Sequence, residues 1–152
     1  MTVSVRPGAP NAAASSFLSG MIREPIAGVR AVCPVDPDTP VALSSPTRTL
    51  DGILRAAAVS TAEWGSTTAM TLPALSTTPR EMAEALDRVA GAGTSDLIDW
   101  QRDAAIEAIV GSWPSQFRTD RAARLGLTAD DSFDGIVAAY LDGVDAGSGA
   151  PA

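Results

Sequence analysis

The 152-residue sequence predicts a mixed α/β fold. Short apolar segments of strand-like composition alternate along the chain with longer segments whose apolar residues recur at helical spacing. Capping residues, proline or glycine bound several of the helical segments. Strands and helices that alternate in this way are typical of α/β packing. The length is that of one domain and is sufficient to bury a sizeable core.

The first predicted elements are a strand, a turn and a helix. Residues 3–5 form a short apolar strand, and Pro7-Gly8 forms the turn that follows it. A helix is predicted over residues 12–23, with Pro25 closing it. Four apolar residues recur on this helix at helical spacing: Phe17, Leu18, Met21 and Ile22.

Two further strands lead into a second helix. Residues 30–35 predict one strand, and residues 41–43 predict a shorter one. Ser45 is then placed as the N-cap of a helix and Pro46 as its first residue. The apolar residues of this helix share one face: Leu50, Ile53, Leu54 and Ala57.

The middle of the chain predicts a turn, a strand and a third helix. Residues 61–65 are a turn, and the alternating residues 68–72 are a strand. The third helix opens with a capping box, in which the side chains of Thr78 and Glu81 each bond the other residue's backbone N–H. Gly91 ends this helix, because glycine suits the residue after a helix C-terminus.

The C-terminal third is predicted to be mostly helical. Residues 96–100 have an ambiguous pattern, whereas residues 104–110 and 121–125 predict helices. Ser132 caps the last helix, and the small residues 146–152 are expected to be a disordered tail. The apolar stripe of the last helix contains five residues: Phe133, Ile136, Val137, Tyr140 and Leu141.

The composition excludes several classes of function. Eighteen carboxylates against eleven arginines give a net charge of −7, which disfavours nucleic acid and anionic membranes as partners. The sequence has no histidine and no lysine, which excludes a Ser-His-Asp triad, a histidine zinc site and a Walker A or Schiff-base lysine. No metal site is predicted. Because no apolar run approaches a membrane span and no secretory signal opens the chain, we expect a cytoplasmic protein.

Several conspicuous side chains are predicted to have structural roles. The single cysteine excludes an internal disulfide and a Cys-x-x-Cys site. Arg23 and Arg55 are interpreted as solvated helix residues. One cysteine and three aromatic residues are predicted to pack in the core or at an interface rather than to react: Cys33, Trp113, Phe117 and Tyr140.

Two stretches resemble a known family. The ending WPSQFRTDRAARLGLTADDSFDGIVAAYL resembles the C-terminus of the extended short-chain dehydrogenases/reductases, the NAD-dependent epimerase/dehydratase group. In that group a short helix ending in Leu-Gly is followed by a turn and a capped terminal helix. The opening VSVRPGAPNAAASSFLSGMIREPIAG, followed by RAVCPV and SSP, is more specific and resembles the D-erythronate dehydrogenases of the group. The resemblance runs in order from residue 3 to about residue 144.

The resemblance implies a fold class and a missing half. In the family, NAD binds a Rossmann domain made mostly by the N-terminal half, and a Tyr-x-x-x-Lys pair performs the acid/base chemistry. This chain has no lysine, and its glycine-containing segment 91–96 follows a helix and has Asp96 in place of a third glycine. The implied fold is α/β, the C-terminal part of an extended Rossmann-type short-chain dehydrogenase/reductase. Residues 1–145 are then mostly the small substrate-binding domain, with no catalytic residue.

The resemblance also assigns roles in the opening segment. The Pro7 and Gly8 backbone is implied to lie beside the nicotinamide ring of NAD, at the carboxyl edge of the sheet. Without the family, an ordinary Pro-Gly turn is the preferred interpretation. Asn11 matches a position that faces substrate in the family. Its alternative role is the N-cap of the helix over residues 12–23.

Three further residues are candidates for substrate binding. Ser15 and Ser16 could contact hydroxyl groups of a sugar acid. Arg48 is the candidate for the carboxylate, because a planar guanidinium pairs with a carboxylate through two hydrogen bonds. The family places arginine directly after Ser-Pro, whereas here Thr47 takes that position and Arg48 follows it.

The sequence is therefore interpreted as the substrate-binding segment of an NAD-dependent dehydrogenase that oxidises a secondary hydroxyl of a small, D-erythronate-like sugar acid. Its expected partner is the N-terminal Rossmann half, without which it is catalytically incomplete. The alternatives are a free-standing binding module derived from that fold and a longer enzyme whose start lies upstream. An isolated half is expected to expose the edge of residues 3–5 and the face that packs on the missing domain.

Overall fold

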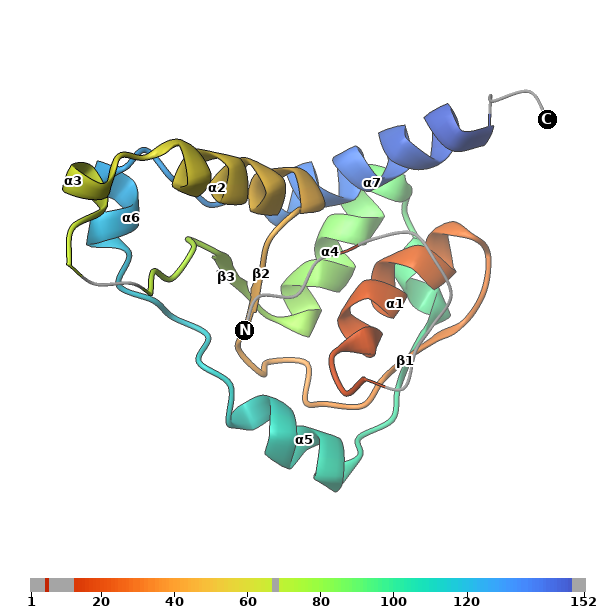
Figure 1. The fold of residues 1–152 in the computed structure, drawn as a ribbon. Helices are drawn as coiled ribbons and strands as arrows, with labels where there is room; N and C mark the ends of the chain where they lie inside the picture. The colour runs from red at the N-terminus through yellow and green to blue at the C-terminus, as the bar shows by residue number, and fades with distance from the viewer. Residues whose placement is uncertain (1–4, 6–12, 67–68, 149–152) are drawn as a thin grey trace.

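A computed structural model describes residue 5, residues 13–66 and residues 69–148 of the chain. Within these residues, seven α-helices, one 3₁₀ helix and four short strands alternate, which confirms the predicted mixed α/β class (Figure 1). The helices are α1 (Ser16–Ile26), α2 (Pro46–Ala58), α3 (Thr61–Trp64), α4 (Pro79–Ala90), α5 (Ala104–Gly111), α6 (Asp120–Arg124), α7 (Phe133–Ser148) and the 3₁₀ helix η1 (Thr94–Leu97). The strands are β1 (Ala31–Cys33), β2 (Val41–Leu43), β3 (Leu75–Thr77) and β4 (Ile98–Trp100).

The four strands form two separate pairs. β1 lies parallel to β4, with Ala31 opposite Ile98 and Cys33 opposite Trp100. β2 lies antiparallel to β3, with Val41 opposite Thr77. The segment whose pattern was ambiguous, residues 96–100, therefore contributes the end of η1 and the strand β4.

The core lies where α1, β1, α4 and α7 meet. α4 contacts both α1 and α7, and α1 covers β1 (Figure 1). We call α1, β1, β4, α4 and α7 the body. Its largest side chains without exposed surface come from three helices and β1: Leu18, Met21, Ile22, Cys33, Met82, Leu86 and Val137.

The helix starts follow the capping signals of the sequence. Thr78 Oγ1 accepts a hydrogen bond from the backbone N–H of Glu81 (3.2 Å), and Glu81 Oε2 accepts one from the backbone N–H of Thr78 (3.0 Å). At the last helix, Ser132 Oγ accepts from Gly135 N–H (3.2 Å). α7 continues to Ser148, three residues into the predicted tail, and the remainder of the tail lies outside the described residues.

The first helix differs from its prediction at both ends. α1 begins at Ser16 rather than residue 12, so Ser15 occupies its N-cap position. The alternative role of Asn11 as the cap of this helix is therefore wrong. Pro25 lies inside the last turn instead of closing the helix, because the backbone continues through a bond from Ala27 N–H to the Arg23 carbonyl (3.2 Å).

Two predictions in the middle of the chain are wrong. The expected turn at residues 61–65 contains α3, which starts with a capping box between Ser60 and Glu63. The expected strand at 68–72 is not a strand in its described residues 69–72, and the strand of this region is β3. β3 follows Pro73, whose missing N–H suits a position before the paired segment.

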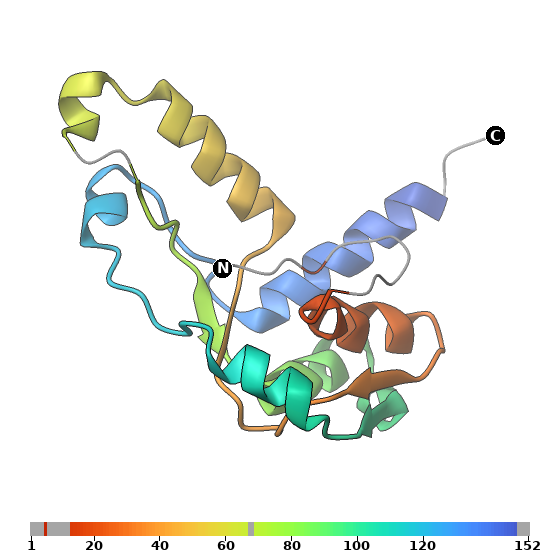
Figure 2. The ribbon, with the colours of Figure 1, turned by 60° about the horizontal axis from the view of Figure 1, so that its bottom comes forward.

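The second helix departs from the body. α2 and α3 extend away from the elements around α4 (Figure 2), and we call residues 46–64 the arm. Gly52 is the one residue of α2 that is buried. The predicted apolar face of α2 is exposed: Leu50 by 59%, Ile53 by 53% and Leu54 by 68%.

Candidate functional site

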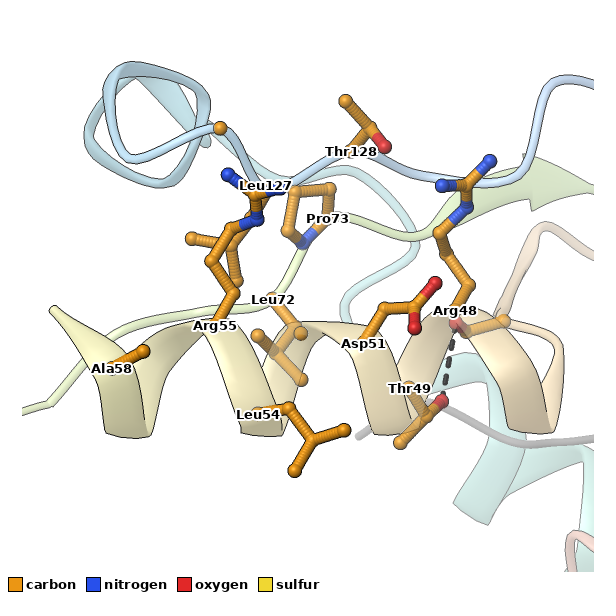
Figure 3. A pocket seen from close by; sticks show the side chains of 13 residues that line it. Arg48, Thr49, Asp51, Leu54, Arg55, Ala58, Leu72, Pro73, Leu127 and Thr128 are labelled. Atoms are coloured by element: carbon orange, nitrogen blue, oxygen red, sulfur yellow. Dashed lines mark hydrogen bonds between the residues drawn. The ribbon is translucent and has the colours of Figure 1, made fainter.

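A cavity of about 580 Å³ runs along α2, and Leu54 of the apolar face is one of its lining residues. Its walls are α2, residues 72–73 and residues 126–128. Figure 3 shows Arg48, Asp51 and Arg55 rising from one side of α2 towards the backbone at Thr128, while Leu54 points the other way. We call it the α2 cavity.

The start of α2 is fixed by a small hydrogen-bond network. Ser45 Oγ accepts from the backbone N–H of Arg48 (3.1 Å), as expected of an N-cap, and Thr49 Oγ1 donates to the Ser45 carbonyl (3.0 Å). The Ser45 N–H donates to Asp130 Oδ2 (2.8 Å), which joins α2 to the segment before α7. These bonds hold the backbone that carries Arg48.

Arg48, the predicted carboxylate ligand, lines the α2 cavity and is half-buried. Its guanidinium has no hydrogen bond or ion pair with any residue that the structure describes. Thr49 and Asp51 line the same cavity. The surroundings thus combine the guanidinium of Arg48 with hydroxyl and carboxylate groups that could bind the hydroxyls of a polyol acid.

Sequence reasoning missed Arg55 as a cavity residue. It is exposed, as predicted, but it lies seven residues after Arg48 and faces the same cavity. Its side chain passes over Gly126, where a Cβ atom would lie 2.7 Å from Arg55 Nη1 and where the backbone has φ +73°. The positive φ favours glycine there, whereas the flexible end of the Arg55 side chain could move away from an added Cβ atom. The spacing of the two arginines on one helix was the available signal.

Ser16 lies in a different cavity. A groove of about 720 Å³ between α1, β1 and α5 is lined by Ser16 and by mostly apolar neighbours. Ser15 stands at the N-cap position of α1 without a capping bond from its side chain, and it lines neither cavity. The structure therefore does not bring Ser15 or Ser16 into one cavity with Arg48.

The predicted cofactor contacts cannot be placed. Pro7, Gly8 and Asn11 lie outside the described residues. Val5 is described and only 2% exposed, so the expectation that the edge of residues 3–5 is exposed is wrong at this residue. Its apolar side chain packs in the core cluster with α1 and α4.

Arg23 is buried, contrary to its prediction as a solvated residue. Its side chain is 13% exposed, pairs with Glu24 (2.5 Å) and donates to Ser19 Oγ (3.3 Å). Burial raises the pKa of the nearby Tyr140 hydroxyl, and Tyr140 packs against the core as predicted. Periodicity alone did not show that Tyr140 of α7 would lie near Arg23 of α1.

The reactive groups predicted to be structural are placed accordingly. Cys33 is completely buried, and this burial raises the pKa of its thiol to about 11. Trp113 packs against the core. Among the described residues, no group of three or more cysteine, aspartate and glutamate side chains is arranged to hold a metal ion.

The glycine-containing segment 91–96 does not form a cradle for the phosphates of NAD. Gly91 ends α4 and Gly93 precedes η1, both with positive φ. The segment follows a helix, as its sequence predicted, and it leads into a 3₁₀ helix. A dinucleotide cradle instead connects a strand to an α-helix. In the part of the chain that the structure describes, no helix has the length and apolarity to span a membrane.

Two curated relatives are similar to nearly the whole chain. It is 47% identical over 146 residues to a D-erythronate dehydrogenase of Cupriavidus necator, which covers 96% of this chain and 44% of the relative. It is 35% identical over 141 residues to a D-erythronate dehydrogenase of Haemophilus influenzae, at 93% of this chain and 45% of the relative. The chain thus spans less than half the length of the curated relatives it matches. No family model matches it.

Solved structures share the fold. A nucleoside-diphosphate-sugar epimerase from Agrobacterium tumefaciens superposes with a TM-score of 0.88 at 35% identity, over 93% of this chain and 41% of that one. An L-threonine dehydrogenase from Phytophthora infestans gives a TM-score of 0.82 at 18% identity, over 96% and 46%, which is a likeness of fold. These comparisons confirm the resemblance to D-erythronate dehydrogenases. They also confirm the fold of a C-terminal part of an extended Rossmann-type short-chain dehydrogenase/reductase.

Proposed function

We propose that residues 1–145 are the substrate-binding segment of an NAD-dependent dehydrogenase that oxidises a secondary hydroxyl of a small sugar acid such as D-erythronate. The observation that carries this proposal is the 47% identity to a D-erythronate dehydrogenase over 96% of the chain. We place the enzyme in the cytoplasm.

In this proposal Arg48 binds the carboxylate of the sugar acid. Support comes from its half-buried position in the α2 cavity and from the lack of a described partner for its guanidinium. Asn11, Ser15 and Ser16 are proposed to contact substrate hydroxyls, and the Pro7-Gly8 backbone to approach the nicotinamide of NAD. Ser16 and Arg48 line separate cavities, so the proposed substrate site is tested by substituting Arg48.

The chain is proposed to be incomplete as a catalyst. It has no lysine to lower the pKa of a catalytic tyrosine, and its described glycines do not form a nucleotide cradle. The nucleotide-binding half is therefore the proposed partner. The apolar face of Leu50, Ile53 and Leu54 on α2 is a surface that such a half could cover, because exposed apolar patches of this kind mark interfaces.

A free-standing binding module is the second candidate. The observation in its favour is that the body closes around its own core, with Val5, Leu86 and Val137 buried without a second domain. Sedimentation of the chain separates the two candidates. Self-association through the exposed α2 face is expected of an isolated half, whereas a cooperatively melting monomer at all concentrations supports the module.

Two measurements test the function. The chain with NAD and D-erythronate is expected to form no NADH, and NADH formation would contradict its incompleteness. Calorimetric titration is expected to show D-erythronate binding that Arg48→Gln weakens roughly 10- to 100-fold, because a charged hydrogen-bond donor is lost. Arg118→Gln is the control, since Arg118 is highly exposed and lines neither cavity. Equal binding of D-erythronate by the Arg48 variant and the parent chain would show that Arg48 does not bind the substrate.

A further inference from the structure

The described arginines divide into seven with a partner and three without. The partnered set comprises Arg23, Arg30, Arg80, Arg88, Arg102 and Arg118, which pair with carboxylates, and Arg121, which lies over the Trp64 ring and donates to backbone carbonyls. The side chains of Arg48, Arg55 and Arg124 have no hydrogen bond or ion pair with a described residue. Three arginines without a carboxylate partner are unexpected in a chain with eighteen carboxylates.

These three arginines lie along one side of α2. Arg48 and Arg55 line the α2 cavity (Figure 3). Arg55 also lines an adjoining cavity of about 420 Å³, together with Arg124. Seven residues of helix separate Arg48 from Arg55 by about 10 Å. Figure 3 shows the guanidiniums of Arg48 and Arg55 at separate positions along α2, whereas Arg55 and Arg124 border the same cavity.

The cavity between Arg55 and Arg124 is positive in a negative protein. One acidic residue, Glu63, lines it. The Glu63 carboxylate accepts hydrogen bonds from the Ser60 hydroxyl (2.7 Å) and backbone N–H (3.2 Å), which lower its pKa and occupy it as a helix cap. The guanidiniums of Arg55 and Arg124 thus line one cavity with a single carboxylate, Glu63, which already accepts hydrogen bonds from Ser60. An oxyanion would relieve their mutual repulsion.

We propose that the cavity between Arg55 and Arg124 binds a phosphate group, as free phosphate or as a phosphate monoester. A guanidinium fork matches the oxygens of phosphate through paired hydrogen bonds. Phosphate and phosphate monoesters carry more than one negative charge at neutral pH (about 1.5 to 2 for a monoester), which matches two guanidiniums better than a single carboxylate does. The site is separate from Arg48 and does not depend on the proposed dehydrogenase function.

The test is an NMR titration of the full ¹⁵N-labelled chain with inorganic phosphate, at constant ionic strength set by chloride. Saturable shifts are expected at the Gly126 amide and at the Arg55 and Arg124 Nε–H signals. Arg55→Gln and Arg124→Gln are each expected to weaken the apparent affinity at least fivefold. Arg118→Gln, on an exposed arginine outside these cavities, is the matched control and is expected to bind like the parent.

The outcomes separate the possibilities. A linear response, or an equal loss in Arg118→Gln, would mean general charge screening and would overturn the site. Arg124→Gln keeps the test valid if Arg55→Gln disturbs Gly126, because Arg124 is exposed. Glycerol 3-phosphate is the second ligand: tighter binding than phosphate identifies a monoester site, and equal binding identifies free phosphate. Failure of D-erythronate to bind would leave this result unchanged.

Discussion

α2 and α4 begin with the same kind of cap and have similar lengths, but their environments are opposite. Each begins with a hydroxyl residue as N-cap followed by proline, and they have 13 and 12 residues. α4 buries five residues between α1 and α7. α2 buries only Gly52 and presents Leu50, Ile53 and Leu54 to solvent.

The difference lies in what surrounds each helix. An apolar stripe predicts a helix and the face that will be covered, but it does not say which segment covers it. For α4 the cover is within this chain. For α2 no described residue covers the stripe, in a chain that spans less than half the length of its curated relatives.

The largest expected effect concerns the reactivity of thiols on the two regions. Ala57→Cys adds a thiol to the exposed face of α2, so that the variant has this thiol as well as the natural, buried Cys33 of the body. We expect the added thiol to react with Ellman's reagent at least about a thousandfold faster than Cys33, which reacts only when the body opens. Burial raises the Cys33 pKa to about 11, so little of the reactive thiolate forms at pH 8.

Both thiols are followed in one reaction with Ellman's reagent, which should show a fast and a slow phase. Unfolding in urea is the control, because it exposes both thiols and should leave a single fast phase. A slow added thiol would mean that the α2 face is covered in the chain alone. A fast Cys33 would mean that the body is loosely packed.

The next effect is on the free energy of unfolding. Leu86→Ala on α4 removes a completely buried side chain and is expected to cost about 2–5 kcal/mol. Leu54→Ala on α2 removes a side chain that is 68% exposed and is expected to change stability by less than about 0.5 kcal/mol. Urea unfolding of the two variants beside the parent measures both values. A comparable cost for Leu54→Ala that grows with protein concentration would show that α2 packs against a second copy.

The sequence predicted those elements that local chemistry specifies. The capping box of Thr78 and Glu81 and the Ser45 cap with Pro46 fixed the starts of two helices within one residue. α3 was equally predictable, because Ser60 and Glu63 carry the same box signal in a segment interpreted as a turn.

Tertiary placement was not predictable from the same patterns. β3 forms at residues 75–77 because β2 is available to pair with it, although residues 68–72 alternate as a strand would. The Arg23 side chain is only 13% exposed and lies near Tyr140 of α7, which its helical position does not reveal.

Only part of the candidate site was predicted, because it too depends on how distant segments pack together. The spacing on α2 places Arg48 and Arg55 on one side of the helix, but Arg124 lies near Arg55 only because residues 124–126 pack beside α2. Residues from distant parts of the chain came together there without any local signal beyond their charge.

The smallest expected effect is the acid dependence that α4 contributes to the body. Asp87 on α4 accepts hydrogen bonds from the Ser95 backbone N–H (2.8 Å) and hydroxyl (2.7 Å), which lower its pKa and tie α4 to η1. Because its folded pKa lies below the unfolded value of about 3.9, the carboxylate stabilises the fold above that pH, and this contribution is lost as the pH falls through the folded pKa.

Asp87→Asn should therefore lower stability slightly at pH 7, and the difference from the parent should shrink as the pH falls below about 4. Hydrogen exchange of the Ser95 amide should quicken, while the amides of α2 stay unchanged. Asp51→Asn on the cavity side of α2 is the matched control, since the exposed Asp51 side chain has no hydrogen bond to a described residue. A difference that persists at low pH would show that Asp87 acts through packing rather than charge, because both side chains are then neutral.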